Sequence, residues 1–471
     1  MESSLIDTTI TFLNDFLWGY IMIALLLGAA LWFTIKTRGV QVANFKEMIR
    51  LLTESNNSTK QTNGISSFKA FTISLASRVG TGNLAGVATA IAIGGPGAVF
   101  WMWVIAILGA SSGFIEATLA QIFKHKEGKE YVGGPAYYME KGLGKRWMGL
   151  LFSLIITITF GLVFNSVQSN TIALAFSDSF DIAPVWSGVA ITALTAIVIF
   201  GGVRRIANVS GVLVPFMAIA YILLALTVVI LNFEKIPQLI ILIVKSAMGW
   251  QEAAAGAVGM ALMQGIRRGL FSNEAGMGSA PNAAATAEVS HPVKQGLIQA
   301  LGVFVDTLLI CSCTAFIVLL SHENFDPSLK GIQLTQAALV SEVGIFGSYF
   351  ISIAILFFAF SSIIGNYYYG EANIKFLTSK SRWLKGYRIG VTAMVMVGAL
   401  ISLETVWNLA DLMMGIMALI NIVAILQLGK YAFKALNDYR AQKAAGIKEP
   451  QFHASTISEI ADKMECWHDK N

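Results

Sequence analysis

The sequence predicts an all-helical protein that crosses a membrane many times. Of its 471 residues, 55% are hydrophobic and 13% are charged, and the mean hydropathy is +0.65. A chain this apolar cannot bury its nonpolar side chains in one water-soluble core. About eleven segments are long and apolar enough to be membrane-spanning helices. They lie near residues 12–35, 70–93, 97–123, 147–176, 183–201, 209–232, 250–289 (interrupted), 293–320, 344–376, 387–403 and 405–429.

The distribution of Lys and Arg predicts how these helices are oriented. Of the 33 basic residues, 27 fall in segments that the alternating spans place on one side, and only Lys235, Lys245 and Lys330 fall on the other. Basic residues near helix ends accumulate on the cytoplasmic side. We therefore expect an outside N-terminus and a cytoplasmic C-terminus, in the inner membrane of a prokaryote. This bias accounts for the net charge of +5, so nucleic acid is not expected as a partner.

The chain divides into two comparable halves, because polar glycine clusters near residues 80 and 276 interrupt two spans. An odd number of helices in each half makes the second half inverted, and inverted repeats with discontinuous first helices are typical of secondary transporters. The predicted parts are an extra N-terminal transmembrane helix (1–35), a cytoplasmic linker (36–69), a first repeat of five helices (70–232), an extracellular loop (233–249), a second repeat of five helices (250–430) and a cytoplasmic tail (431–471).

The first interruption, called here the first break, runs from Ala76 to Asn83, and we expect the helix to be broken near 77–83. Unwound backbone there would leave carbonyl groups that can bind Na⁺ and amide groups that can hold a carboxylate. The alternative is that the glycines only allow close packing of helices. Arg78 and Asn83 favour a functional break, because polar side chains are costly in hydrocarbon.

The second break is predicted near 270–281 and includes Asn273, Gly276 and Met277. Pro281 suits the first turn of a further short helix. An ordinary loop between two shorter spans is the alternative. Such a loop would reverse the side of every later segment and contradict the distribution of basic residues.

Further polar side chains are expected at membrane depth. Ser361 and Ser362 could bind an ion or bond to the backbone of their own helix. Phe164 could simply pack, whereas Gln168 needs a partner. Charged side chains within a bilayer are usually paired, so we expect pairing, structural or functional, among the buried charges. These are Arg78, Glu116, Arg267, Arg268, Glu274 and Asp306.

Several other classes of protein find no support in the sequence. It contains no phosphate-binding loop and no recognisable Ser/His/Asp arrangement, so an ATP-driven pump or an enzyme is not expected. Its three cysteines, Cys311, Cys313 and Cys466, predict neither a disulfide nor a metal framework.

Three stretches resemble the alanine/glycine:cation symporters, also called the sodium:alanine symporter family. They are Ser77–Asn83 (SRVGTGN), Gly94–Trp103 (GGPGAVFWMW) and Arg268–Pro281 (RGLFSNEAGMGSAP), and the similarity extends from about Trp18 to Lys430. The resemblance implies a LeuT-like fold of five plus five inverted helices, preceded by one extra helix. It also implies sodium-coupled uptake of small neutral amino acids.

The resemblance further implies roles for individual residues. The amides of Thr81 and Gly82 would hold the substrate carboxylate, and Phe164 and Gln168 would line the pocket. A sodium site would be formed by the carbonyls of Ala76 and Val79 and the hydroxyls of Ser361 and Ser362. The second break, with Asn273, Gly276 and Met277, would face the amino group and side chain of the substrate. For a second sodium site near Asn83 the other ligands cannot be assigned, and Arg78 beside it would repel a cation.

The sequence therefore predicts sodium-coupled symport by alternating access in a lipid bilayer, with Na⁺ as the co-transported ion. One alternative is proton coupling in the same fold, with Arg78 taking the place of the cation and Glu274 or another acid titrating. A channel is disfavoured because no filter segment is repeated. The preference among alanine, glycine, a D-isomer and glutamine stays open, as does the oligomeric state.

Overall fold

The protein is almost entirely helical. The computed structural model describes residues 5–57, 64–128, 130–250, 255–321 and 329–468. Within them, seven helices are long and apolar enough to cross a membrane, and further apolar helices are shorter. The predicted all-helical, multi-pass class is therefore confirmed. Residues 58–63 of the predicted linker and residues 251–254 of the predicted second repeat lie outside the described residues, and the boundaries of the repeats stay a prediction.

The elements of the first half include one short hairpin, in which β1 and β2 pair antiparallel with His125 opposite Val132. In chain order they are α1 (Leu5–Phe16), η1 (Leu17–Met22), α2 (Ile23–Lys36), α3 (Val40–Ala43), α4 (Phe45–Asn57), α5 (Ser67–Arg78), η2 (Gly82–Gly86), α6 (Val87–Gly94), α7 (Gly97–Ile122), β1 (His125–Glu127), β2 (Glu130–Val132), α8 (Pro135–Tyr137), η3 (Tyr138–Gly142), α9 (Arg146–Ile158), η4 (Thr159–Phe164), α10 (Asn165–Phe180), α11 (Pro184–Ile199) and α12 (Gly202–Leu231).

The described elements of the second half are helical. They are η5 (Phe233–Lys235), α13 (Ile236–Met248), α14 (Ala255–Asn273), α15 (Ala280–Ala284), α16 (Pro292–Val303), η6 (Phe304–Cys311), α17 (Ser312–Leu320), α18 (Ile332–Val343), α19 (Ile345–Leu377), α20 (Ser381–Gly398), α21 (Leu403–Ala444) and η8 (Ala454–Lys463).

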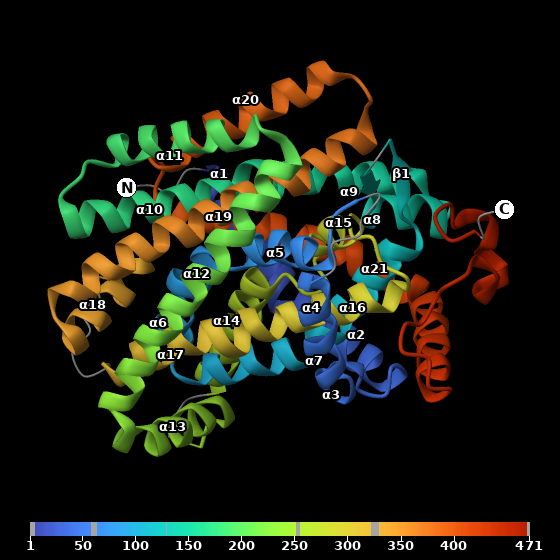
Figure 1. Cartoon of the computed structure of the whole chain (residues 1–471). Coiled ribbons are helices and arrows are strands. Elements are labelled where there is room, and N and C mark those ends of the chain that lie inside the picture. Colours follow the sequence, from blue (N-terminus) through green and yellow to red (C-terminus); the bar gives the residue numbers. More distant parts are fainter. Residues whose placement is uncertain (1–4, 58–63, 129, 251–254, 322–328, 469–471) are drawn as a thin grey trace.

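The interrupted helices lie in the middle of the molecule. Helix α7 packs against α14 and α16, while α10 packs against α19 and α20. Figure 1 shows α5, α7, α14 and α16 crossing the centre, with α10, α11, α19 and α20 grouped along one edge. Helix α19 contacts α5, so it joins the two groups beside the first break.

Three π-helical segments lie at or within central helices: η4 and η6 fall inside long helices, and η2 begins the short helix Gly82–Gly94. They include Gly82, Asn83, Phe164 and Asp306. An extra residue in a helical turn redirects the side chains and frees backbone groups, and such turns occur frequently at functional sites. Hydrophobic periodicity does not predict them, because the segments remain apolar and helical.

The structure contains helices that the hydropathy of the sequence misses. Helix α13 occupies most of the predicted loop 233–249, and its apolar face, with Leu239, Ile243 and Ala247 buried, packs against α7. Helix α18 lies between two predicted spans. The last predicted span ends at residue 429, but α21 continues to Ala444. These segments are too short or too polar on one face for a window that searches for whole spans.

Candidate functional site

The first break begins where α5 ends. Arg78 is its last residue, and Val79 adopts extended backbone angles, φ −81° and ψ 93°. The amide and the hydroxyl of Thr81 both donate to Gln168 Oε1, at 2.9 and 2.7 Å, and the Gly80 amide donates to Asn83 Oδ1 at 2.9 Å. The structure thus brings Thr81 and Gln168 together, and side-chain oxygens accept hydrogen bonds from the amides that the interruption frees.

Five neutral oxygens meet where α19 crosses the first break, and we call them the cation cluster. They are the carbonyl oxygens of Ala76, Val79 and Phe358 and the hydroxyl oxygens of Ser361 and Ser362. Ser362 Oγ lies 2.9 Å from Ala76 O, 3.2 Å from Val79 O and 3.1 Å from Phe358 O. Ser361 Oγ lies 2.8 Å from Phe358 O and 3.5 Å from Ala76 O. Each hydroxyl has one hydrogen, so lone pairs outnumber the hydrogens available to them.

Gly80 lies between this cluster and Gln168. A Cβ at position 80 would be 2.2 Å from Ser362 Oγ and 2.8 Å from Gln168 Oε1. The two candidate binding regions therefore approach each other as closely as the backbone allows, and only glycine fits between them.

Three aromatic rings, those of Phe164, Phe271 and Trp407, pack in a row beside the first break. The ring centroids of Phe164 and Phe271 are 4.8 Å apart, and those of Phe271 and Trp407 are 4.7 Å apart. A Cβ on Gly82 would lie 3.0 Å from the Phe271 ring and 3.2 Å from Ser272 Cα. Phe271 and Ser272 of α14 therefore touch the first break at Gly82. Both lie within the second break predicted near 270–281, but nothing in the sequence assigned them a binding role.

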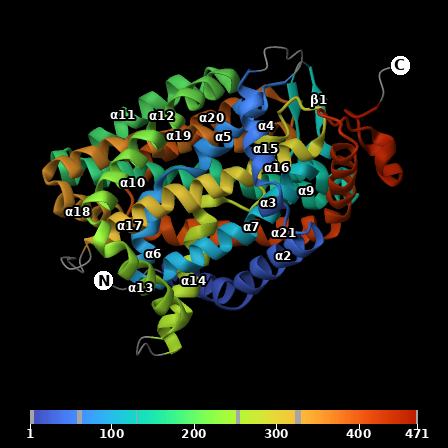
Figure 2. The same ribbon diagram turned by 60° about the horizontal axis from the view of Figure 1, so that its bottom comes forward.

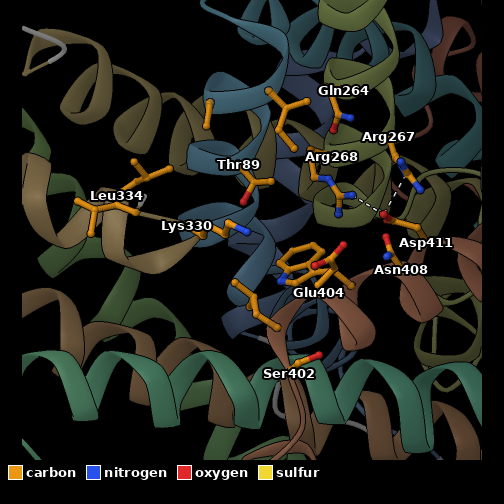
Figure 3. Close-up of a pocket in the computed structure, with 16 residues that line it drawn as sticks. Thr89, Gln264, Arg267, Arg268, Lys330, Leu334, Ser402, Glu404, Asn408 and Asp411 are labelled. Carbon is orange, nitrogen blue, oxygen red and sulfur yellow. Dashed lines mark hydrogen bonds and ion pairs between the residues drawn. The ribbon is translucent and has the colours of Figure 1, made fainter. Parts of the chain in front are cut away.

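A cavity of about 630 Å³ lies beyond these rings, bordered by α6, α14, α18 and the start of α21. Trp407 lines this cavity as well as contacting Phe271. Figure 3 shows Arg267 and Arg268 directed toward Asp411. Both arginines form ion pairs with Asp411 Oδ2, at 3.0 Å for Arg267 Nε. We call this cavity the vestibule.

The second break is held by a buried carboxylate that comes from α7. Glu116 accepts hydrogen bonds from the amides of Gly276 and Gly278, each at 3.1 Å. Asn421 donates to Glu116 Oε2 at 2.8 Å and to the Gly276 carbonyl at 2.9 Å. Both glycines have positive φ, 86° and 83°, which an L-residue would adopt only with strain. Glu116 therefore holds the amides of this break.

Two further carboxylates connect the breaks. Ser77 donates to Glu274 Oε1 at 2.7 Å, and Ser279 donates to Glu274 Oε2. Asp306 accepts from Asn83 Nδ2 at 2.7 Å and from the hydroxyls of Ser272 and Thr307, each at 2.8 Å. Asn83 therefore has polar neighbours in the structure, Asp306 and through it Ser272 and Thr307. Asn83 is far from all three in the sequence, so their proximity could not be predicted from it.

The expectation that the six buried charges pair with one another is wrong. Among the described residues, Arg267 and Arg268 pair with Asp411, and no ion pair within 4 Å joins either to Glu116, Glu274 or Asp306. Arg78 donates to the Gln299 carbonyl at 3.2 Å. The acids instead accept from hydroxyls and amides, which satisfy a buried carboxylate without a cation.

The remaining predicted residues of the second break make their described contacts away from the first break. Asn273 accepts from the Ala275 amide at 3.0 Å and donates to Thr307 at 3.3 Å. Met277 is fully buried. No described hydrogen bond joins Asn273, Gly276 or Met277 to the first break, so their role toward a substrate stays a prediction.

The fold aligns with that of the transporter MhsT, whose structure was determined in complex with L-phenylalanine. The alignment covers 87% of this chain and 94% of MhsT, with a TM-score of 0.57 and 13% identity. At this identity the similarity establishes the fold alone. The protein thus has the LeuT fold, and its long apolar helices make it a multi-pass membrane protein.

Sequence comparison identifies the family within this class. Residues 3–454 match the sodium:alanine symporter family. The probable sodium/glutamine symporter GlnT of Bacillus subtilis is 54% identical over 96% of this chain and 94% of its own. The sodium/alanine symporter AgcS of Methanococcus maripaludis is 36% identical over 94% of this chain and 98% of its own. The chain belongs to the sodium:alanine symporter family, which confirms the resemblance found in its motifs.

Proposed function

We propose that this protein is a sodium-coupled symporter of small neutral amino acids that works by alternating access. The observation that carries the proposal is the cation cluster, in which the carbonyls of Ala76 and Val79 meet the hydroxyls of Ser361 and Ser362. The five oxygens have more lone pairs than the two hydroxyl hydrogens can satisfy, and a cation at their centre would satisfy the others. A set of neutral oxygens suits a monovalent ion, because divalent ions are usually bound with carboxylates.

The substrate carboxylate would take the place that Gln168 Oε1 now occupies beside Thr81, with Gly82 supplying a second amide. A carboxylate is the stronger acceptor, since charge-assisted hydrogen bonds are roughly twice as strong as neutral ones. The amino group and side chain would face the second break, where Asn273, Gly276 and Met277 lie.

Coupling would act through Gly80. An ion bound at the cation cluster fixes the carbonyls of Ala76 and Val79, and thereby orients the amides that follow them in the chain. Sodium and amino acid then raise each other's affinity by the same factor, as thermodynamic linkage requires. Asn83 and Arg78 would hold the two ends of the first break, Asn83 through Asp306 and Arg78 through the Gln299 carbonyl.

The substrate would be a small amino acid, because Phe271 lies against Gly82 in the first break and Phe164 packs on Phe271. The names of the two relatives favour alanine and glutamine as substrates, and glycine or D-isomers remain candidates. We place the protein in the plasma membrane of a prokaryote with the N-terminus outside, so that the vestibule opens outward. Highly exposed apolar side chains on α11 and α12, such as Ile197, Val212 and Phe216, suit contact with lipid.

Uptake by purified protein in liposomes tests this function. With an inward sodium gradient, labelled alanine is expected to accumulate above its outside concentration, and a panel of unlabelled amino acids should rank the substrates by competition. Accumulation driven by a pH gradient alone, without sodium, would establish proton coupling instead. Equilibration that never exceeds the outside concentration would indicate a channel.

A further inference from the structure

Residues 447–468, which follow α21, lie across one end of the molecule. In this tail segment, residues 447–468, the side chains of Phe452, Ile457, Ile460 and Trp467 are buried. Figures 1 and 2 both show it beside the β1–β2 hairpin. This is the end that the basic residues assign to the cytoplasm. We call the segment the strap.

Both interrupted helices reach this end at one point. The chain just before α5 and the chain just after α15 pair in parallel, with Ile65 opposite Ala287. The Ala287 carbonyl accepts from Lys124 Nζ at 3.1 Å and from Gln121 Nε2 at 3.0 Å. Lys124, 2% exposed, also donates to Gln121 Oε1 at 2.8 Å. The end of α7 therefore binds the chain after α15, which in turn pairs with the chain before α5.

The strap covers this junction. The Lys124 ammonium lies 4.8 Å from the ring centroid of Trp467 and 4.2 Å from that of Tyr131. Trp467 Nε1 donates to the Gln121 carbonyl at 2.9 Å, and the Cys466 thiol donates to the Lys124 carbonyl at 3.4 Å. Burial lowers the pKa of Lys124 to about 8, which leaves it charged at neutral pH for contact with the two rings.

Two further sets of contacts hold the strap to other elements. Glu465 pairs with His125 of the hairpin and with Lys141 of η3. The Phe452 amide donates to the Ser290 carbonyl at 2.9 Å, in the loop between α15 and α16. The strap thus reaches from the β1–β2 hairpin and η3 to the loop between α15 and α16.

We propose that the strap keeps the cytoplasmic end closed and must lift from Lys124 before substrate is released there. A path to that side would have to open between the ends of α5 and α15, which pair at Ile65 and Ala287. Lys124 holds the Ala287 carbonyl in this pair, and Trp467 covers Lys124. The inference rests on the alternating-access function proposed above. It makes the tail a regulator of the inward-opening step, since whatever binds or displaces the strap changes the rate of release.

Cys466 supplies a natural reporter of strap movement. The other two cysteines, Cys311 and Cys313, are buried within the central helices. In inside-out vesicles, a membrane-impermeant maleimide is expected to label Cys466 slowly in sodium alone and several-fold faster in sodium plus alanine. Labelling of Cys466→Ser gives the background. Equal rates with and without alanine would overturn the proposal.

Trp467→Ala removes the indole from Lys124 and is expected to raise the labelling rate in sodium alone several-fold. It should also raise the external alanine concentration needed for half-maximal uptake, because the outward-facing state is less populated. Glu459→Gln is the matched control, since Glu459 lies in the strap but pairs with Lys434 at the surface, and it should behave as wild type. A Trp467→Ala variant with wild-type labelling and uptake would refute the strap. Loss of sodium-driven uptake in the unmodified protein would refute the proposed function instead.

Discussion

Ser362→Ala tests the cation cluster most directly. The hydroxyl of Ser362 lies within 3.2 Å of the Ala76, Val79 and Phe358 carbonyls, and it is fully buried, so no water replaces it at once. A polar contact to a charged group contributes about 1.5–3 kcal/mol. At about 1.4 kcal/mol per factor of ten, the loss corresponds to a roughly 10- to 150-fold higher sodium concentration for half-maximal uptake.

The assay is initial alanine uptake into liposomes over a range of sodium concentrations. The maximal rate at saturating sodium should change little, because the transport path is unaltered. At low sodium the apparent alanine affinity should fall with the sodium affinity, as reciprocal coupling demands. Ser352→Ala is the matched control, since this buried hydroxyl on the same helix donates to the Ser348 carbonyl at 2.8 Å, away from the cluster. A Ser362→Ala protein with the sodium dependence of wild type would refute the assignment.

Three further changes have expected outcomes. Gly80→Ala places a methyl group against both Ser362 and Gln168, so half-saturating sodium and alanine should both rise by about tenfold or more, and a rise in only one would contradict the shared position. Glu116→Gln leaves a glycine amide of the second break without an acceptor, about 1–3 kcal/mol, which thermal unfolding in detergent should detect. Glu47→Gln should destabilise the protein at pH 7. Because Arg50 holds the pKa of Glu47 at about 2, below its ordinary 4.5, the difference should vanish as pH falls from about 4.5 to about 2. A difference that persists at pH 2 would contradict this.

The sequence predicted best where the chemistry is local. The first break could be recognised because polar residues are costly in apolar helices. The Ser361–Ser362 pair left both an ion site and bonding to its own helix open, and the sodium site was implied by the family resemblance. The structure brings these residues together, with Ser362 Oγ 2.9 Å from Ala76 O. Phe358 was not predicted, because only its backbone carbonyl belongs to the cation cluster and every residue type has that carbonyl.

The partners of the buried charges could not be predicted, because pairing depends on which helices touch. Asp411 was not among the six charges considered, yet it pairs with both Arg267 and Arg268 across α14 and α21. The packing of the strap against the helices could not be predicted for a related reason. Its buried residues, such as Phe452 and Trp467, are scattered in a polar stretch, and only the folded protein shows the surface that they cover.

The two breaks look alike in sequence but differ in what their backbone amides contact. In the second break the amides of Gly276 and Gly278 are already bonded to the carboxyl group of Glu116. In the first break the amide of Thr81 bonds only to the neutral oxygen of Gln168, which a charged carboxylate can displace. This difference supports the proposed orientation of a zwitterion, with its carboxylate at the first break and its amino group toward the second. Glu116 would set that direction through its bonds to the Gly276 and Gly278 amides.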